Sequence, residues 1–107
     1  MKFLELIEID NLVVHCNTED QANKLLEIAN AYGLKWCNGD SYIGNNNFEK
    51  HGSGTCYYLS DGTYSSLEYF KMLYCSIIEF DDVEFDDLML SDLNKEQTTR
   101  FIENPIS

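Results

Sequence analysis

Positive charge is scarce in this chain. Its 107 residues include seven Lys and Arg against nineteen Asp and Glu, which gives a formal net charge of −12. Affinity for DNA and RNA comes largely from basic side chains that neutralise phosphates. The charge balance therefore argues against direct binding to nucleic acid, and equally against binding to anionic membrane surfaces. Residues 72–94 contain no Lys or Arg at all, so we expect any partner of this region to be basic.

Long apolar runs are also missing. No stretch approaches the roughly 18 apolar residues that a membrane-spanning helix needs. The first ten residues, MKFLELIEID, carry acidic side chains where a signal peptide would have an uninterrupted apolar core, and no small-residue cleavage site follows them. The sequence therefore predicts a cytoplasmic protein.

Close pairs of cysteines, of the C-x-x-C type, do not occur. Four single cysteines stand far apart, each inside an apolar or aromatic stretch: Cys16, Cys37, Cys56 and Cys75. Zinc modules usually supply their ligands as close pairs on a tight turn, so this spacing gives no support for a metal. We interpret the cysteines as small buried hydrophobic residues rather than as disulfide, metal or catalytic groups, and we predict no cofactor.

Apolar residues are plentiful, at 44% of the chain, and aromatic residues make up 13%. A disordered acidic tail lacks such content, so the chain should fold. Its length suits a single domain over residues 1–107, of which residues 81–107 form an acidic C-terminal extension. The pattern predicts an α+β fold, in which a mostly antiparallel sheet carries one amphipathic helix on a face, together with short helical segments.

The helix is predicted at about residues 19–32. The hydroxyl of Thr18 can cap its free amides, and Gln21 stands three residues later, as in a capping box. Gly33 can end the helix because a residue without Cβ readily adopts the left-handed conformation. Apolar residues recur with helical spacing on one side, at Ala22, Leu25, Leu26 and Ala29.

Strands are predicted on both sides of this helix. Residues 3–9 and 12–16 are apolar and β-branched runs separated by Asp10-Asn11, and they predict two strands or one long bent strand. Further strands are expected at residues 34–37, 55–60 and 75–80. Asp61-Gly62 is a strong turn signal.

The remaining segments are expected to be loops and short helices. Residues 38–54 have no sustained period and predict a long loop. Ser65 and Glu68 offer a second capping box for a short helix at residues 67–73. A last helix, capped by Ser91 or Asp92, would have to end before Pro105.

Catalytic and metal-binding patterns are weak. His15 and Cys16 are neighbours in a predicted strand, so their side chains point to opposite faces, and nothing indicates that His51 meets a cysteine. The spacing Asp82-x-Glu84-x-Asp86 begins like a calcium-binding EF-hand loop, but Asp87 stands where that loop needs Gly, and the acidic ligand at its end is missing. The sequence therefore predicts neither an enzyme nor a dedicated metal site.

The acidic run near the C-terminus is the strongest functional feature. Seven carboxylates lie within the fourteen residues from Glu79 to Asp92, and the tetrapeptide EFDD occurs twice. On an extended strand, alternate side chains would stand about 6.6 Å apart on one face, which is comparable with the spacing of phosphates along a nucleic-acid strand. The predicted partner-binding residues are Glu79, Asp81, Asp82, Glu84, Phe85, Asp86 and Asp87. The candidate apolar anchors are Phe85, Leu88, Met89 and Leu90.

A second explanation of the same acids is structural. Charged residues on an outer strand prevent sheets from pairing edge to edge. On sequence alone, a solvated edge and a binding surface are equally good explanations of the run.

Three short motifs give the chain a resemblance to known proteins. They are GLKWCNG at residues 33–39, TCYY at 55–58 and SIIEF at 76–80. In their order the chain resembles small, uncharacterised proteins encoded by phages and prophages of Gram-positive bacteria, over about residues 11–80. The resemblance implies no defined activity. By analogy it implies an inhibitor of host nucleic-acid enzymes or of defence nucleases, as anti-CRISPR proteins are.

Together these observations predict a non-enzymatic, acidic phage-type inhibitor in the host cytoplasm. It would bind a basic, nucleic-acid-binding site of a bacterial protein, such as a defence or CRISPR nuclease, and act as a nucleic-acid mimic. One alternative is a small-ligand binding protein that sequesters a nucleotide signal through the loop at residues 38–54, with Tyr42, Phe48 and Lys50 as contacts. Another is a structural phage protein that oligomerises through a sheet edge.

Overall fold

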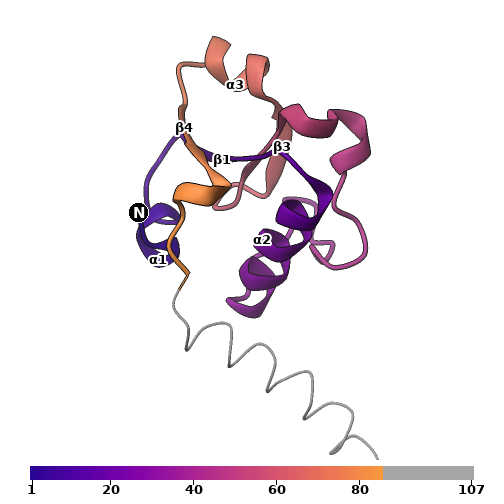
Figure 1. Cartoon of the computed structure of the whole chain (residues 1–107). Coiled ribbons are helices and arrows are strands. Elements are labelled where there is room, and N and C mark those ends of the chain that lie inside the picture. The colour runs from indigo at the N-terminus through magenta and orange to yellow at the C-terminus, as the bar shows by residue number, and fades with distance from the viewer. Residues whose placement is uncertain (86–107) are drawn as a thin grey trace, which may run out of the picture.

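The computed structural model describes residues 1–85. They form a four-stranded mixed sheet with helices on both faces (Figure 1). The helices are α1 (Phe3–Leu6), α2 (Glu19–Ala31) and α3 (Leu67–Met72), with single-turn 3₁₀ helices η1 (Phe48–Lys50), η2 (Gly52–Gly54) and η3 (Phe80–Asp82). The strands are β1 (Leu12–Cys16), β2 (Thr55–Tyr58), β3 (Thr63–Ser66) and β4 (Ser76–Glu79). The predicted α+β fold is confirmed.

The sheet has the strand order β3-β2-β1-β4. β1 pairs antiparallel with β2 and parallel with β4, and β2 pairs antiparallel with β3. All five residues of β1 are buried, as a central strand covered on both faces requires. β4 therefore lies at one edge of the sheet, directly before the acidic run.

Two apolar clusters lie on opposite faces of the sheet. The larger one joins α1 and α2 to the side chains of Val14, Tyr57 and Ile78. The smaller one places Phe70 of α3 on Val13 and Cys56. Side chains alternate along β1 and β2, so each strand contributes to both clusters.

Helix α2 forms as its caps predict. The Thr18 hydroxyl accepts a hydrogen bond from the Gln21 amide at 3.2 Å. At the other end the Gly33 amide donates to the Asn30 carbonyl and the Leu34 amide to the Ala29 carbonyl, while Gly33 has a φ of +85°. These two bonds are a Schellman motif with Gly at its left-handed position.

The N-terminal segment corrects one prediction. Residues 3–9 do not form a strand, because Phe3–Leu6 is helical and a turn follows it. Phe3 and Leu6, three residues apart, are both buried on the larger cluster, whereas Leu4 is half exposed. A short apolar run fits either period, and here packing against the core selects the helical one.

Two further predictions fail locally. Residues 34–37 are not a strand, because the Trp36 amide donates to the Asp40 carbonyl and the Cys37 amide to the Gly62 carbonyl. These bonds make a turn instead of a ladder. Helix α3 begins at Leu67 as predicted, but its capping residue is not the predicted one, since the side chain of Ser66, and not that of Ser65, accepts the Tyr69 amide.

None of the helices within residues 1–85 is long and apolar enough to cross a membrane. The helix expected after Ser91 or Asp92 lies outside the described residues.

Candidate functional site: an acidic face at the end of β4

The acidic run leaves the sheet at Glu79. Residues Phe80–Asp82 form a 3₁₀ turn, closed by the Val83 amide donating to the Phe80 carbonyl at 3.1 Å. The predicted extended ladder of carboxylates is therefore wrong at Asp81 and Asp82, where the spacing of about 6.6 Å on one strand face does not occur. Val83 turns inward and is buried, which anchors the turn to the core.

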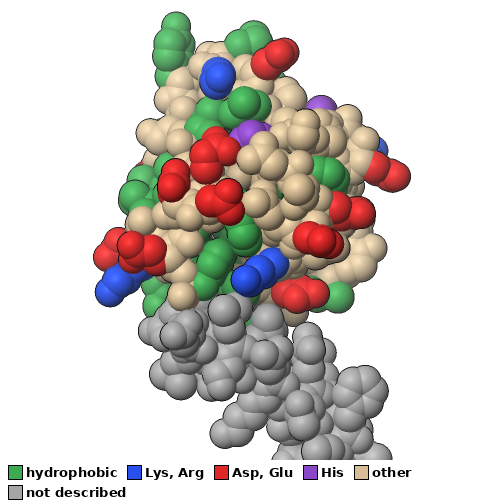
Figure 2. All heavy atoms as spheres, viewed as in Figure 1, with side chains coloured by type: hydrophobic (Ala, Val, Ile, Leu, Met, Phe, Trp, Pro, Cys, Tyr) green, Lys and Arg blue, Asp and Glu red, His purple; other side chains and the backbone are tan. Residues whose placement is uncertain are grey.

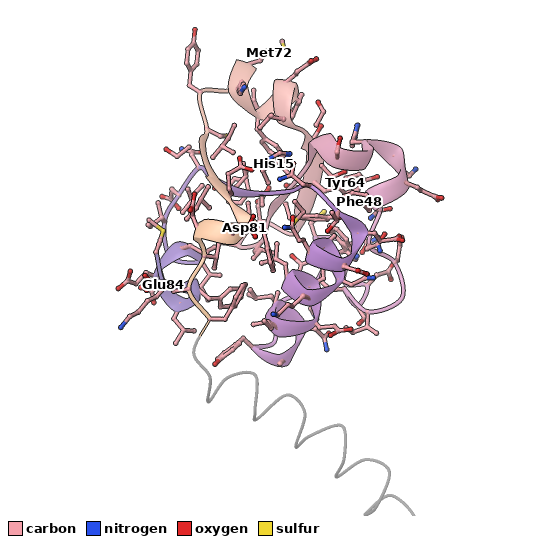
Figure 3. All side chains as sticks on the ribbon, viewed as in Figure 1. His15, Phe48, Tyr64, Met72, Asp81 and Glu84 are labelled. Atoms are coloured by element: carbon pink, nitrogen blue, oxygen red, sulfur yellow. The ribbon has the colours of Figure 1, made fainter. Side chains whose placement is uncertain are left out.

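Four carboxylates surround this turn, and we call them the acidic face: Glu79, Asp81, Asp82 and Glu84. Glu79 is half buried and the other three are exposed. Figure 2 shows acidic side chains gathered in the middle of the viewed surface, next to a histidine. Asp81 and Glu84 lie on this side of the molecule, close to the turn (Figure 3).

Glu79 is joined to a buried histidine. Its carboxylate lies 2.7 Å from Nδ1 of His15, whose side chain is nearly enclosed within β1. Nε2 of the same ring donates to the Ser53 carbonyl at 2.6 Å, because a carbonyl oxygen only accepts. His15 thereby connects β1, β4 and η2, and Glu79 serves the fold as well as the surface.

Asp81 connects the acidic face to α2. The side-chain amide of Gln21 donates to Asp81 at 3.3 Å, and Gln21 also accepts the Asn17 amide at 2.8 Å. Glu19 and Asp20 are exposed in the same first turn of α2. The carboxylates in the first turn of α2 therefore extend the negatively charged surface of the η3 turn.

The charge of this face is barely compensated. Within residues 1–85 the one ion pair joins His15 and Glu79, and it carries charge on both sides only when His15 is protonated. The backbone of Lys2 pairs with that of Glu84, but no salt bridge joins their side chains. The N-terminal ammonium group of Met1 donates to the backbone carbonyl of Asp82 at 3.1 Å, which places one positive charge beside the turn. The exposed carboxylates of Asp82 and Glu84 have no salt-bridge partner within residues 1–85.

Phe85 packs partly on the core, and its role in partner binding stays a prediction. Its ring is half buried and lies 5.9 Å from Phe3 and 5.5 Å from Phe80, measured between ring centroids. Such spacing is typical of aromatic pairs in a core. The other predicted charges and anchors lie outside the described residues: Asp86, Asp87, Leu88, Met89 and Leu90.

The loop at residues 38–54 is tied to the sheet at several points. The Tyr42 hydroxyl donates to the Leu59 carbonyl at 3.1 Å, the Trp36 indole to the Asn45 carbonyl at 3.1 Å and the Tyr57 hydroxyl to the Asn46 carbonyl at 2.6 Å. Tyr42 is only 2% exposed. Its ring belongs to the core, whereas the small-ligand alternative predicted that it contacts the ligand.

A hollow of about 350 Å³ opens beside this loop. Its wall combines the rings of Trp36 and Tyr64, 5.5 Å apart between centroids, with three asparagines of the loop. The lining residues are Trp36, Cys37, Asn38, Asn45, Asn47, Gly62, Thr63 and Tyr64. Phe48 and Lys50 are not among them, and none of the lining side chains is charged.

The cysteines divide into two groups. Cys16 and Cys56 are buried as predicted, and burial raises the pKa of the Cys56 thiol to about 12 and that of Cys16 further. The prediction is wrong for Cys37, which is exposed at the rim of the hollow, while Cys75 is partly buried. No group of three or more His, Cys, Asp or Glu side chains within residues 1–85 is arranged to hold a metal ion.

The chain matches no protein-family model, no curated protein and no solved structure. Its function therefore has to be argued from the geometry of the chain itself. One part of that geometry, the contact between His15 and Glu79, was missed by the sequence analysis. A histidine inside a fully apolar strand requires a polar partner, and that requirement is the signal that could have revealed it.

Proposed function

We propose that the protein is a non-enzymatic inhibitor that binds, through its acidic face, a basic nucleic-acid-binding site on a bacterial protein. A defence or CRISPR nuclease in the host cytoplasm is the kind of target that the phage resemblance suggests. Bound there, the inhibitor would exclude nucleic acid by occupying the site. Such competition requires no catalytic residue.

The observation that supports this proposal is the cluster of exposed carboxylates without a salt-bridge partner around η3. Asp81, Asp82 and Glu84 are exposed, and no Lys side chain forms a salt bridge with them. A concentrated field of one sign accelerates encounter with a surface of the opposite sign. The net charge of −12 acts in the same direction at longer range.

The structure changes the form of the mimicry. Because the chain turns after Glu79, the carboxylates cluster around a single 3₁₀ turn instead of following a phosphate backbone step by step. We therefore propose competition by clustered charge, in which Asp81 and Asp82 act together with Glu19 and Asp20 of α2. Neutralising Asp81 and Asp82 should weaken binding most directly.

The test is affinity capture from a bacterial lysate on the immobilised protein, repeated with added DNA as a competitor. We expect a nucleic-acid-binding protein to be retained at low salt and to be released by DNA and by high salt. The immobilised double variant Asp81→Asn/Asp82→Asn should no longer capture the nucleic-acid-binding protein, while its own melting temperature stays unchanged. The control variant Glu8→Gln/Glu49→Gln removes the same amount of charge outside the acidic face and should still capture that protein.

Two outcomes would count against the proposal. One is capture of no nucleic-acid-binding protein. The other is capture that DNA and the Asp81/Asp82 substitutions leave unchanged. In either case the acids would serve only to keep the edge of the sheet solvated.

The hollow beside Trp36 favours a second candidate function, the sequestration of a small ligand. Two aromatic rings and three asparagines without a charged neighbour suit a neutral planar group such as a nucleobase. We expect a mononucleotide series to raise the melting temperature of the wild type, and Tyr64→Ala to abolish that rise. Ser60→Ala, at an exposed position outside the hollow, is the control. No rise with any nucleotide would exclude this function.

A further inference from the structure

Helix α3 is apolar on two sides. Phe70 faces the sheet and is buried, whereas Tyr69, Met72 and Leu73 lie on the outside with exposed fractions of 48%, 75% and 53%. These three residues have the spacing i, i+3 and i+4, so they form one stripe along the short helix. Met72 is at the top of the view in Figure 3, away from η3, and its side chain points away from the body.

Tyr74 extends this stripe in an unfavourable backbone conformation. Its φ is +58°, and its side chain is 94% exposed. The Tyr74 amide donates to the Lys71 carbonyl and the Cys75 amide to the Phe70 carbonyl, so α3 ends in the same Schellman motif as α2. α2 has Gly33 at the equivalent position. A bulky residue at this left-handed position is strained, and its exposed ring does nothing for the fold of its own chain.

The stripe also lies in a segment without acidic residues, although the chain as a whole is very acidic. Residues 69–78 contain no Asp or Glu, although the chain has nineteen of them. Glu68 and Lys71 are exposed on α3 itself. These two side chains give α3 no net charge, so two copies of the helix repel each other little despite the charge of the whole chain.

The area and shape of the stripe also fit a second copy. The four exposed side chains present on the order of 500 Å² of surface, so two copies would bury on the order of 1,000 Å², the lower limit for a specific interface. Beside the stripe lies a hollow of about 660 Å³, lined in part by Tyr58, Tyr69 and Leu73. Asp61 is the one carboxylate that lines it. A projecting ring next to a hollow can satisfy the self-complementarity of a two-fold interface.

We propose that α3 is a self-association surface. Two copies of the chain pack α3 antiparallel on α3, and the Tyr74 ring of each copy enters the hollow beside α3 of the other. The interface is distinct from the acidic face. Its area lies at the lower limit for a specific interface, so the dimer should be reversible.

Salt dependence provides a sharp test of this dimer. Each copy carries a charge of −12, so screening should strengthen the association, whereas it weakens binding of a basic partner. We expect sedimentation velocity on the purified full chain to show a monomer–dimer equilibrium across micromolar concentrations. Raising NaCl should shift it toward the dimer.

Substitutions locate the contact. Tyr74→Gly places the preferred residue at the left-handed position, so it should keep or raise the melting temperature while lowering dimer affinity at least tenfold. Met72→Ser should also lower the dimer affinity. Ile43→Ser removes a half-exposed apolar side chain from the loop, outside α3, and should leave the dimer unchanged.

The dimer does not depend on the proposed inhibitor function. Asp81→Asn/Asp82→Asn should leave self-association intact or strengthen it, so each proposal can fail alone. A monomer at every concentration would overturn the α3 proposal, as would a dimer that survives Tyr74→Gly/Met72→Ser or dissociates as salt rises. A monomer that binds neutral lipid vesicles through Tyr74 would overturn it too, because the occupant of the stripe would then be a membrane.

Discussion

At the scale of single residues, Gly62 decides how the β2–β3 turn meets the rest of the molecule. Its φ is +74°, and a Cβ at this position would stand 2.5 Å from the Cys37 amide nitrogen and 2.7 Å from the Lys35 carbonyl oxygen. The Gly62 carbonyl accepts the Cys37 amide at 3.0 Å. Backbone meets backbone here, so no flexible side chain can move aside to make room.

Gly62→Ala should therefore be severely destabilising. We expect it to lower the free energy of unfolding by about 3 kcal/mol, because both the left-handed conformation and the close approach penalise a Cβ. Urea unfolding followed by Trp36 fluorescence measures the loss. Gly39→Ala is the matched control: it has a φ of +94° with nothing near its Cβ position, and should cost only about 1 kcal/mol. Equal losses in the two variants would show that the close approach does not matter.

At the scale of elements, phenol groups hold the long loop to the sheet. Tyr42 and Tyr57 each donate to a backbone carbonyl, which their ionised forms could not do. Burial raises the pKa of Tyr42 to about 12 and also raises that of Tyr57. The folded protein thus keeps protons that an unfolded chain releases near pH 10.

The stability should therefore fall in alkali. Below pH 10 both phenols are protonated in the folded and in the unfolded state, so they contribute no pH dependence. Above pH 10 each phenol lowers the free energy of unfolding by about 1.4 kcal/mol per pH unit, until that phenol also ionises in the folded protein. Urea unfolding between pH 8 and about 11.5 measures this slope. The variant Tyr42→Phe/Tyr57→Phe should be less stable at neutral pH and should have a smaller slope. An unchanged slope would assign the alkaline loss to other groups.

The elements that could be predicted from sequence are those with local signals. α2 has a capping residue, an apolar stripe and a terminal glycine, and it forms between the expected limits. β1, β2 and the turn at Asp61-Gly62 likewise follow local patterns. Residues 3–9 carry no cap or turn that separates helix from strand, and the core decides between them.

The acidic site was less predictable because its shape depends on contacts distant in sequence. The extended ladder assumed that β4 continues past Glu79, but burial of Val83 requires the chain to turn. Glu79 meets His15 from 64 positions away. The exposed stripe of α3 could not be recognised either, since only the structure shows that Leu67 and Phe70 face the sheet and that Tyr69, Met72 and Leu73 do not.

At the scale of the whole molecule, the apolar stripe of α3 and the acidic face lie at opposite ends of the edge strand β4. β4 leads from the acid-free turn at Tyr74 to the acidic face at Glu79, a distance of only about 17 Å along an extended chain. Ionic strength acts on these surfaces in opposite directions, because it screens attraction at one and repulsion at the other. The salt dependence of any measured interaction therefore identifies the surface that makes it.

The central position of β1 has a consequence for how the chain is made. Both of its neighbours in the sheet come much later in the sequence, and β4 is the last strand of the described residues. During synthesis at about 5–20 residues per second, the apolar segment LVVHC would wait several seconds for its parallel partner. Until then its backbone and side chains are open to other chains, so the first strand translated is also the one most in need of a chaperone.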